Sequence, residues 1–483
     1  MSEILAQVAF VMIAALAIAP MVFYASSLLY VGFRFRQGSI SFLVKTLVIG
    51  LMTVPVAILV TLWAILHFAA IGALWMRRIL AKCTGKAIMT VADTESPHQP
   101  DDVVVHLVHG TFESNADWTN PDSPLCKAIL TRNPSVRLSR FIWSGLNTHR
   151  ARREAADLFA GQVLASPSRK QYVVAHSHAG NIVRDASERV PAIAQKIQGV
   201  ALLSTPFIFR KTVERTGRGF VFTHSMGFAV VVQLPLALAL VPFDAYGPVV
   251  AGLSMVLATL IEMKISQRFQ AELNKELEIE NGDVELRDVQ ILHAIGDEAD
   301  SLLRFVSFLH ESCFGLFSQL QATARQMSGH EVPHLVALGI LAIAMAGTWL
   351  SDLTGRSFWI SAIGVVAVGV LGAYLKERYR PSGDQPMVLM MMALPVGFIS
   401  FWLAAAKSLA YGDWRLLFCP SIFISSSETP VGGQHNPIKY APDNDGMLVH
   451  STHSHRKAIR DVAEWLYMRE TSPTSGTVRS HHD

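Results

Sequence analysis

The sequence contains few charged residues, and its two signs nearly balance. Charged residues make up 16% of the 483 residues, hydrophobic residues make up 51%, and the mean hydropathy is +0.33. Soluble globular domains carry about 25% charged residues, so this composition excludes an ordinary soluble domain as the whole of the chain. The formal net charge is only +3, which gives no electrostatic reason to expect a nucleic-acid partner.

Cysteine is also scarce. The chain holds four cysteines, and their positions form no close pattern: Cys83, Cys126, Cys313 and Cys419. Such spacing excludes a disulfide framework and gives no zinc-ligand motif, and it is consistent with a reducing compartment. We therefore expect no metal and no cofactor.

Long apolar runs account for the composition. A membrane-spanning helix needs about 20 apolar residues, and runs of this kind recur at Ile4–Phe33, Thr46–Met76, Gly219–Phe243, Ala245–Ile261, Val332–Ser351, Ser357–Leu375 and Pro386–Ala406. No basic residue precedes the first run and a second run follows at once, so a cleaved signal peptide is not favoured. The last run has Pro395 at its middle, and we expect it to be re-entrant or interfacial. The sequence thus predicts a multi-pass protein of the cell (inner) membrane, with the lipid bilayer as a partner.

Basic residues next to these runs suggest an orientation. They follow the second run, precede the third and follow the fourth, whereas the turn at 241–248 has none. By the positive-inside rule, the polar parts of the chain are then cytoplasmic. Arg34, Arg36 and Lys45, between the first two runs, argue against this unless the first run lies partly in the interface. The residues that favour it are Arg77, Arg78, Lys82, Lys86, Arg210, Lys211, Arg215, Arg218, Lys264 and Arg268.

Ser177 lies at the end of an apolar strand, in the sequence QYVVAHSHAGN. Small residues around it, Ala175, Ala179 and Gly180, allow the tight strand-to-helix turn that lifts a serine hydroxyl clear of a sheet. Alone, this pattern is weak evidence, because a serine in an ordinary strand-to-helix turn produces it too.

Three other segments of the chain carry residues that could act together with Ser177. An earlier strand, Val103–Val108, ends in His109-Gly110-Thr111-Phe112, and a later strand with the sequence VQILHAI precedes Asp297. A histidine-rich segment that begins at His450 precedes a C-terminal helix. A nucleophilic serine needs a histidine base, and the histidine needs an acid that orients it.

Taken together, these motifs resemble the α/β-hydrolase superfamily, in its lipase and esterase branch. The resemblance implies an α/β-hydrolase fold, doubly wound around a mostly parallel sheet, here combined with an α-helical transmembrane region. It further implies that Ser177 is the nucleophile, His450 the base and Asp297 the acid. The oxyanion donors are the backbone N–H of His178 and that of Thr111 or Phe112.

Alternatives remain for the base and the acid. His453 and His455 follow His450 closely, and the histidine-rich run also fits a metal site or a merely solvated segment. Asp300 and Asp445 compete with Asp297, because proximity in the fold decides a triad. His109 is expected to brace its loop, and the rings of His176 and His178 to point away from the serine.

The expected organisation alternates hydrolase and membrane segments. It comprises a membrane anchor (1–92), three hydrolase parts (93–215, 264–330 and 413–470), two membrane insertions (216–263 and 331–412) and a disordered tail (471–483). The expected activity is hydrolysis of carboxylic esters, either lipid-like or small. A thioesterase, an amidase, an acyltransferase and a non-catalytic membrane scaffold with a degenerate hydrolase domain remain alternatives.

Overall fold

A parallel β-sheet forms the centre of the domain that holds Ser177. The computed structural model describes residues 72, 73, 76, 99–113, 116–212, 217–228, 247–280, 286–326, 386–430, 435–442 and 449–471. Within them, six strands form one sheet in the order β2-β1-β3-β4-β6-β8, and every neighbouring pair is parallel. The strands are β1 (Val103–Val108), β2 (Val136–Phe141), β3 (Lys170–His176), β4 (Ile197–Leu203), β6 (Val289–Ala294) and β8 (Ile438–Tyr440).

Helices cover both faces of this sheet. Because side chains alternate along a strand, Val173 faces one core while Val174 faces the other. The first core holds α4 (His149–Ala165), α5 (Ala179–Arg189) and α6 (Pro191–Lys196), and the second holds α3 (Pro124–Arg132) and α14 (Arg456–Thr471). The predicted α/β class with a mostly parallel, doubly wound sheet is confirmed.

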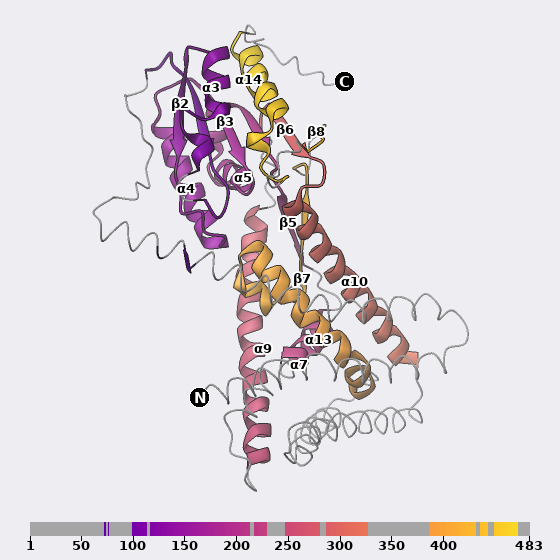
Figure 1. Cartoon of the computed structure of the whole chain (residues 1–483). Helices are drawn as coiled ribbons and strands as arrows, with labels where there is room; N and C mark the ends of the chain where they lie inside the picture. The colour runs from indigo at the N-terminus through magenta and orange to yellow at the C-terminus, as the bar shows by residue number, and fades with distance from the viewer. Residues whose placement is uncertain are drawn as a thin grey trace, which may run out of the picture.

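Long helices form a second layer beside the carboxyl ends of the strands (Figure 1). Helices α7 and α10 both pack against α13, and α10 also packs against the antiparallel strand pair β5–β7. Helix α9 runs without interruption across residue 263, where the sequence suggested a boundary. The elements of this layer are β5 (Phe207–Thr212), α7 (Gly217–Phe228), α9 (Gly247–Glu280), α10 (Glu298–Gln326), α13 (Pro386–Tyr411), η3 (Trp414–Leu417) and β7 (Ile422–Ser427).

The membrane predictions receive no support from the described helices. None of them combines the length and the apolar character needed to cross a bilayer. This includes α9, which contains most of the predicted run Ala245–Ile261, and α13, which contains Pro386–Ala406. The predicted runs 4–33, 332–351 and 357–375 lie outside the described residues, as do most of 46–76 and of 219–243.

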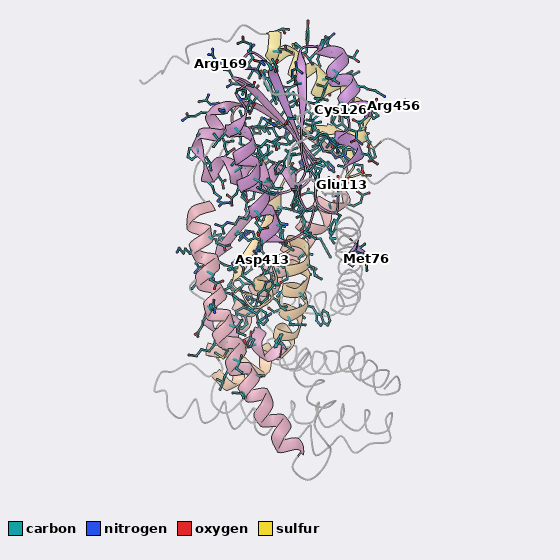
Figure 2. All side chains as sticks on the ribbon, turned by 90° about the vertical axis from the view of Figure 1, so that its left-hand side faces the viewer. Met76, Glu113, Cys126, Arg169, Asp413 and Arg456 are labelled. Carbon is teal, nitrogen blue, oxygen red and sulfur yellow. The ribbon has the colours of Figure 1, made fainter. Side chains whose placement is uncertain are left out.

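Side chains pack densely between the sheet and its covering helices (Figure 2). In that view, Glu113 lies at the end of the sheet that faces the long helices, and Asp413 lies farther down, among those helices. Gly412, which precedes Asp413, has a φ of 63°, and a Cβ there would lie 2.1 Å from the carbonyl oxygen of Asn147. The two layers therefore touch through backbone at this point.

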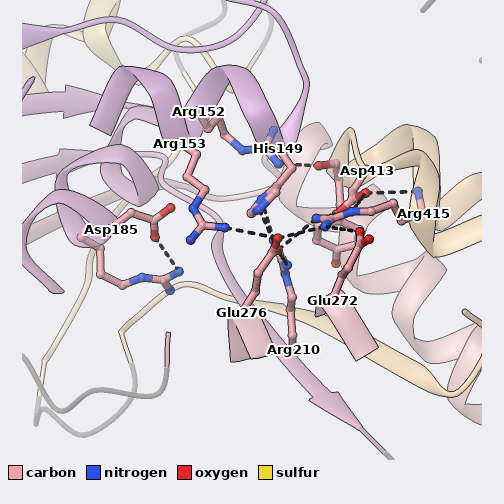
Figure 3. A network of polar contacts seen from close by, with 11 residues as sticks. His149, Arg152, Arg153, Asp185, Arg210, Glu272, Glu276, Asp413 and Arg415 are labelled. Carbon is pink, nitrogen blue, oxygen red and sulfur yellow. Dashed lines mark hydrogen bonds and ion pairs between the residues drawn. The ribbon is translucent and has the colours of Figure 1, made fainter. Parts of the chain in front are cut away.

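An ionic network centred on Glu276 joins the layers (Figure 3). This carboxylate from α9 contacts His149 at 3.1 Å, Arg153 at 3.2 Å, Arg210 at 3.5 Å and Arg415 at 2.9 Å. Burial alone would raise the pKa of Glu276, but hydrogen bonds from His149 and Arg415 and their charges outweigh it and lower that pKa. Arg210, which the sequence placed at a membrane boundary, is thus a buried member of a structural joint.

Candidate active site

Ser177 lies in a strained turn directly after β3. Its φ is 58°, in the left-handed region that non-glycine residues seldom occupy. Its N–H donates to the carbonyl of Leu203 at 2.9 Å, and α5 begins two residues later. A Cβ on Gly110 would lie only 2.8 Å from the Cβ of Ser177, so this loop approaches closely because position 110 is glycine.

Three predicted residues from distant parts of the chain meet at this turn. Ser177 Oγ lies 2.8 Å from His450 Nε2, and His450 Nδ1 lies 2.9 Å from each carboxylate oxygen of Asp297. An ionised carboxylate only accepts, so Nδ1 carries the proton and donates to Asp297. Nε2 then accepts from the hydroxyl of Ser177, which is the arrangement of a general base.

Local hydrogen bonds hold the Asp297 carboxylate in position for its contact with His450. It follows β6, and its Oδ1 accepts from the N–H groups of Ala299 and Asp300 at 3.0 and 3.1 Å, which caps α10. Burial alone would raise the pKa of Asp297, but the hydrogen bond and the charge of His450 outweigh burial and hold that pKa below its usual value. A carboxylate that stays ionised in this position can stabilise a positive charge on the adjacent imidazole.

The competing acids and bases that lie within the described residues are engaged elsewhere. Asp300 forms an ion pair with Arg304 at 2.7 Å, and Asp445 lies outside the described residues. The ring of His453 stacks on Trp118 with centroids 5.4 Å apart, and His455 Nε2 lies 2.9 Å from the carbonyl of Ala441. None of these contacts involves Ser177.

The loop after β1 is braced around His109. Its Nδ1 donates to the carbonyl of Gly110 at 2.9 Å, and its Nε2 accepts from the N–H of Trp143 at 3.2 Å. Burial lowers the pKa of His109 to about 4, so the ring stays neutral and keeps both bonds at neutral pH. His109 thus holds the loop in place, the role the sequence suggested.

The three expected oxyanion donors differ in availability. The N–H of Phe112 already donates to the carbonyl of Gly145 at 2.7 Å. The N–H groups of Thr111 and His178 donate to no acceptor among the described residues. Of the two loop candidates, Thr111 is therefore the one whose N–H can turn to a ligand without breaking an existing bond.

Sequence reasoning missed two residues that contact His450. Glu298 accepts from the N–H groups of Val449 and His450, both at 3.1 Å, and His176 Nε2 lies 2.9 Å from the carbonyl oxygen of His450. The ring of His176 therefore packs against the site. Its position next to Ser177 and the position of Glu298 next to Asp297 were the only signals in the sequence.

Within the described residues, no three His, Cys, Asp or Glu side chains gather in a way that could hold a metal ion. Comparison with protein-family models, with curated proteins and with solved structures finds no match to this chain.

Proposed function

We propose that this chain is a serine hydrolase of the α/β-hydrolase type that cleaves carboxylic esters. The observation that carries the proposal is the chain of contacts from Ser177 Oγ through His450 to Asp297, at 2.8 and 2.9 Å. Its support comes from the left-handed backbone at Ser177 and from the parallel sheet, in which β3 ends directly before Ser177 and β6 ends shortly before Asp297.

In the proposed reaction, Ser177 Oγ attacks the ester carbonyl while His450 Nε2 takes its proton. The N–H groups of His178 and Thr111 hold the oxyanion of the tetrahedral intermediate. His450 then gives its proton to the leaving alcohol, and an acyl-enzyme remains on Ser177. Water, deprotonated by His450, attacks the acyl group and regenerates the serine.

We further propose that the substrate is a lipid-like ester at the cytoplasmic face of the cell membrane. The support is compositional, because apolar runs at 4–33, 46–76, 332–351 and 357–375 are each long enough for a membrane segment. Asp297 also directly precedes α10, so the triad lies where the sheet meets the layer of long helices.

A fluorophosphonate probe tests the central proposal, because it reacts covalently with an activated serine. Labelling of the wild-type chain should be lost in Ser177→Ala. The matched control is Ser187→Ala, which removes a buried hydroxyl from the helix that follows the turn and should stay labelled.

The outcome also separates the remaining alternatives. Hydrolysis of matched ester, thioester and amide series by the labelled protein identifies the bond that is cleaved, and transfer to an added alcohol identifies an acyltransferase. A folded wild-type chain that takes no label would instead leave a non-catalytic membrane scaffold as the better description.

A further inference from the structure

His450 is held through its backbone from both sides. The carboxylate of Glu298 accepts from the N–H of His450 and from that of Val449, both at 3.1 Å. On the other side, His176 Nε2 lies 2.9 Å from the carbonyl oxygen of His450. A carbonyl oxygen only accepts, so Nε2 of His176 carries the proton and donates.

Each of these two contacts starts next to another member of the triad. Glu298 follows Asp297, and His176 precedes Ser177. The segment that carries the acid therefore binds the backbone N–H of the base, and the strand that carries the nucleophile binds its backbone carbonyl. Both contacts involve only the backbone of His450. They therefore fix the backbone position from which the side chain extends, without occupying either imidazole nitrogen.

We propose that Glu298 and His176 are positioning residues that clamp the backbone of His450 and thereby set the geometry of the triad. The role rests on the proposed hydrolase function, in which His450 is the base.

The surroundings of His176 suit this role. Its ring is buried between His450 and His453, with centroids at 5.1 and 4.5 Å. Burial and the nearby charges of His453 and His450 lower the pKa of His176 well below its usual value, so it stays a neutral donor with one N–H. The carbonyl of His450 therefore accepts from a buried ring that stays neutral, while its N–H donates to the carboxylate of Glu298.

Variants of Glu298 test its contact with the backbone of His450. Glu298→Gln keeps one acceptor oxygen but turns an NH₂ group toward the second N–H and removes the charge. We expect kcat to fall by about 10- to 100-fold with KM within about twofold, because misplacing a catalytic group by 1 Å costs about 10²-fold.

Two further variants at this position sharpen the test. Glu298→Asp keeps both carboxylate acceptors on a shorter side chain, so it should recover part of the kcat that Glu298→Gln loses. Glu311→Gln is the matched control, because it removes an exposed carboxylate from the same helix, about 20 Å farther along at 1.5 Å per residue. It should leave kcat unchanged.

Variants of His176 test the other side of the clamp. His176→Phe keeps a ring of similar size but removes the donor, and it should lower kcat in the same range without moving KM. His176→Gln restores an N–H donor and should recover part of kcat. If Phe and Gln are equally active, donation to the carbonyl of His450 has no role.

A readout that needs no turnover distinguishes failure of the clamp from failure of the hydrolase proposal. The Nδ1 proton shared by His450 and Asp297 should give a low-field proton resonance, since it lies in a charge-assisted hydrogen bond. That resonance should broaden or shift in Glu298→Gln and His176→Phe and persist in Glu311→Gln. An unchanged resonance with unchanged kcat overturns the clamp, and a loss of kcat explained by a lower melting temperature alone also overturns it. A wild-type chain that resists the fluorophosphonate while its resonance responds to the variants overturns only the hydrolase activity.

Discussion

Gly110 and Ser177 face each other across a gap that leaves no room for a side chain. A methyl group at position 110 would lie 2.8 Å from the Cβ of Ser177 and 3.2 Å from the carbonyl oxygen of His176. Such separations are well inside van der Waals contact, so either the loop or the nucleophile must shift.

We therefore expect Gly110→Ala to lower ester hydrolysis by about 10²-fold, the cost of misplacing a reacting group by 1 Å. Gly161→Ala is the matched control, because no atom lies within 4 Å of its added methyl group in α4. It should leave activity intact and raise stability by about 0.5–1 kcal/mol, since alanine favours a helix over glycine. Steady-state rates and melting temperatures of both variants check this, and an active Gly110→Ala would show that the loop yields freely.

The burial of His453 predicts how the stability of the fold changes as the pH falls. Burial and, to a lesser extent, the charge of His450 lower the pKa of His453 to about 4. Between about 4 and the ordinary value near 6.5, the unfolded chain binds a proton that the folded chain does not, so stability falls as the pH falls through this window. His453→Phe, which keeps the stacking on Trp118, should abolish this loss.

The free energy of unfolding should then decrease between pH 7 and pH 5 by about 1 to 2 kcal/mol less in His453→Phe than in the wild type. Denaturant titrations at both pH values measure the difference. The variant should also keep its ester hydrolysis at pH 7.5. An inactive, folded His453→Phe would transfer the role of base from His450 to His453.

At the scale of elements, the sequence predicted those parts whose signal is local. The strand at Val103–Val108, the strand just before Asp297 and the C-terminal helix after the histidine-rich segment were expected, and they are present as β1, β6 and α14. Strand β8 was missed because Ile438–Tyr440 is too short to carry a pattern.

Contacts between distant elements were beyond sequence reasoning for a different reason. The pairing of β5 with β7 joins Phe207 to Ser427, and His176 reaches His450 across more than half of the chain. No local pattern encodes such pairs, because each partner reads as an ordinary polar or strand residue in its own segment. The order of Ser177, Asp297 and His450 was accessible only because the family resemblance supplied it.

At the scale of elements, Glu276 joins several helices and strands, and its replacement gives a specific prediction about stability. It is the carboxylate shared by cations from α4, β5 and the segment after α13, and only 17% of its side chain is exposed. Glu276→Gln leaves these cations facing one another in a partly buried site. We expect a loss of about 3 kcal/mol in the free energy of unfolding, the cost of removing one partner from a buried ionic group.

Glu272→Gln serves as the control for this joint. Its side chain is 41% exposed and contacts Arg415 at 3.9 Å and the exposed Arg268 at 3.0 Å, so its removal should cost less than about 1 kcal/mol. Thermal or denaturant unfolding of both variants measures the contrast. Equal losses would show that the network around Glu276 adds nothing beyond surface ion pairs.

At the scale of the whole molecule, the position of the triad bears on the substrate. The strand ends that carry Ser177 and Asp297 lie beside the layer of long helices (Figure 1), and the side chain of Phe112, next to the oxyanion loop, is 45% exposed. Phe112 lies two residues beyond Gly110, which approaches Ser177, and in the proposed reaction its partly exposed ring would suit an apolar acyl chain better than a small polar ester. The long apolar runs outside the described residues favour a lipid source for that chain.

This reasoning predicts that activity rises with acyl chain length and with an interface. Each methylene fully removed from water contributes about 0.8 kcal/mol, so kcat/KM should rise up to about fourfold per added methylene until the binding groove is filled. A series from acetyl to palmitoyl esters, assayed in buffer, in micelles and in bilayers, measures both effects. Phe112→Ala should flatten the dependence on chain length while leaving acetyl ester hydrolysis near the wild-type rate, because the exposed ring contacts only the longer chains. Best activity on acetyl esters, with no gain at an interface, would instead describe a hydrolase whose pocket faces water and whose apolar runs serve only to anchor it.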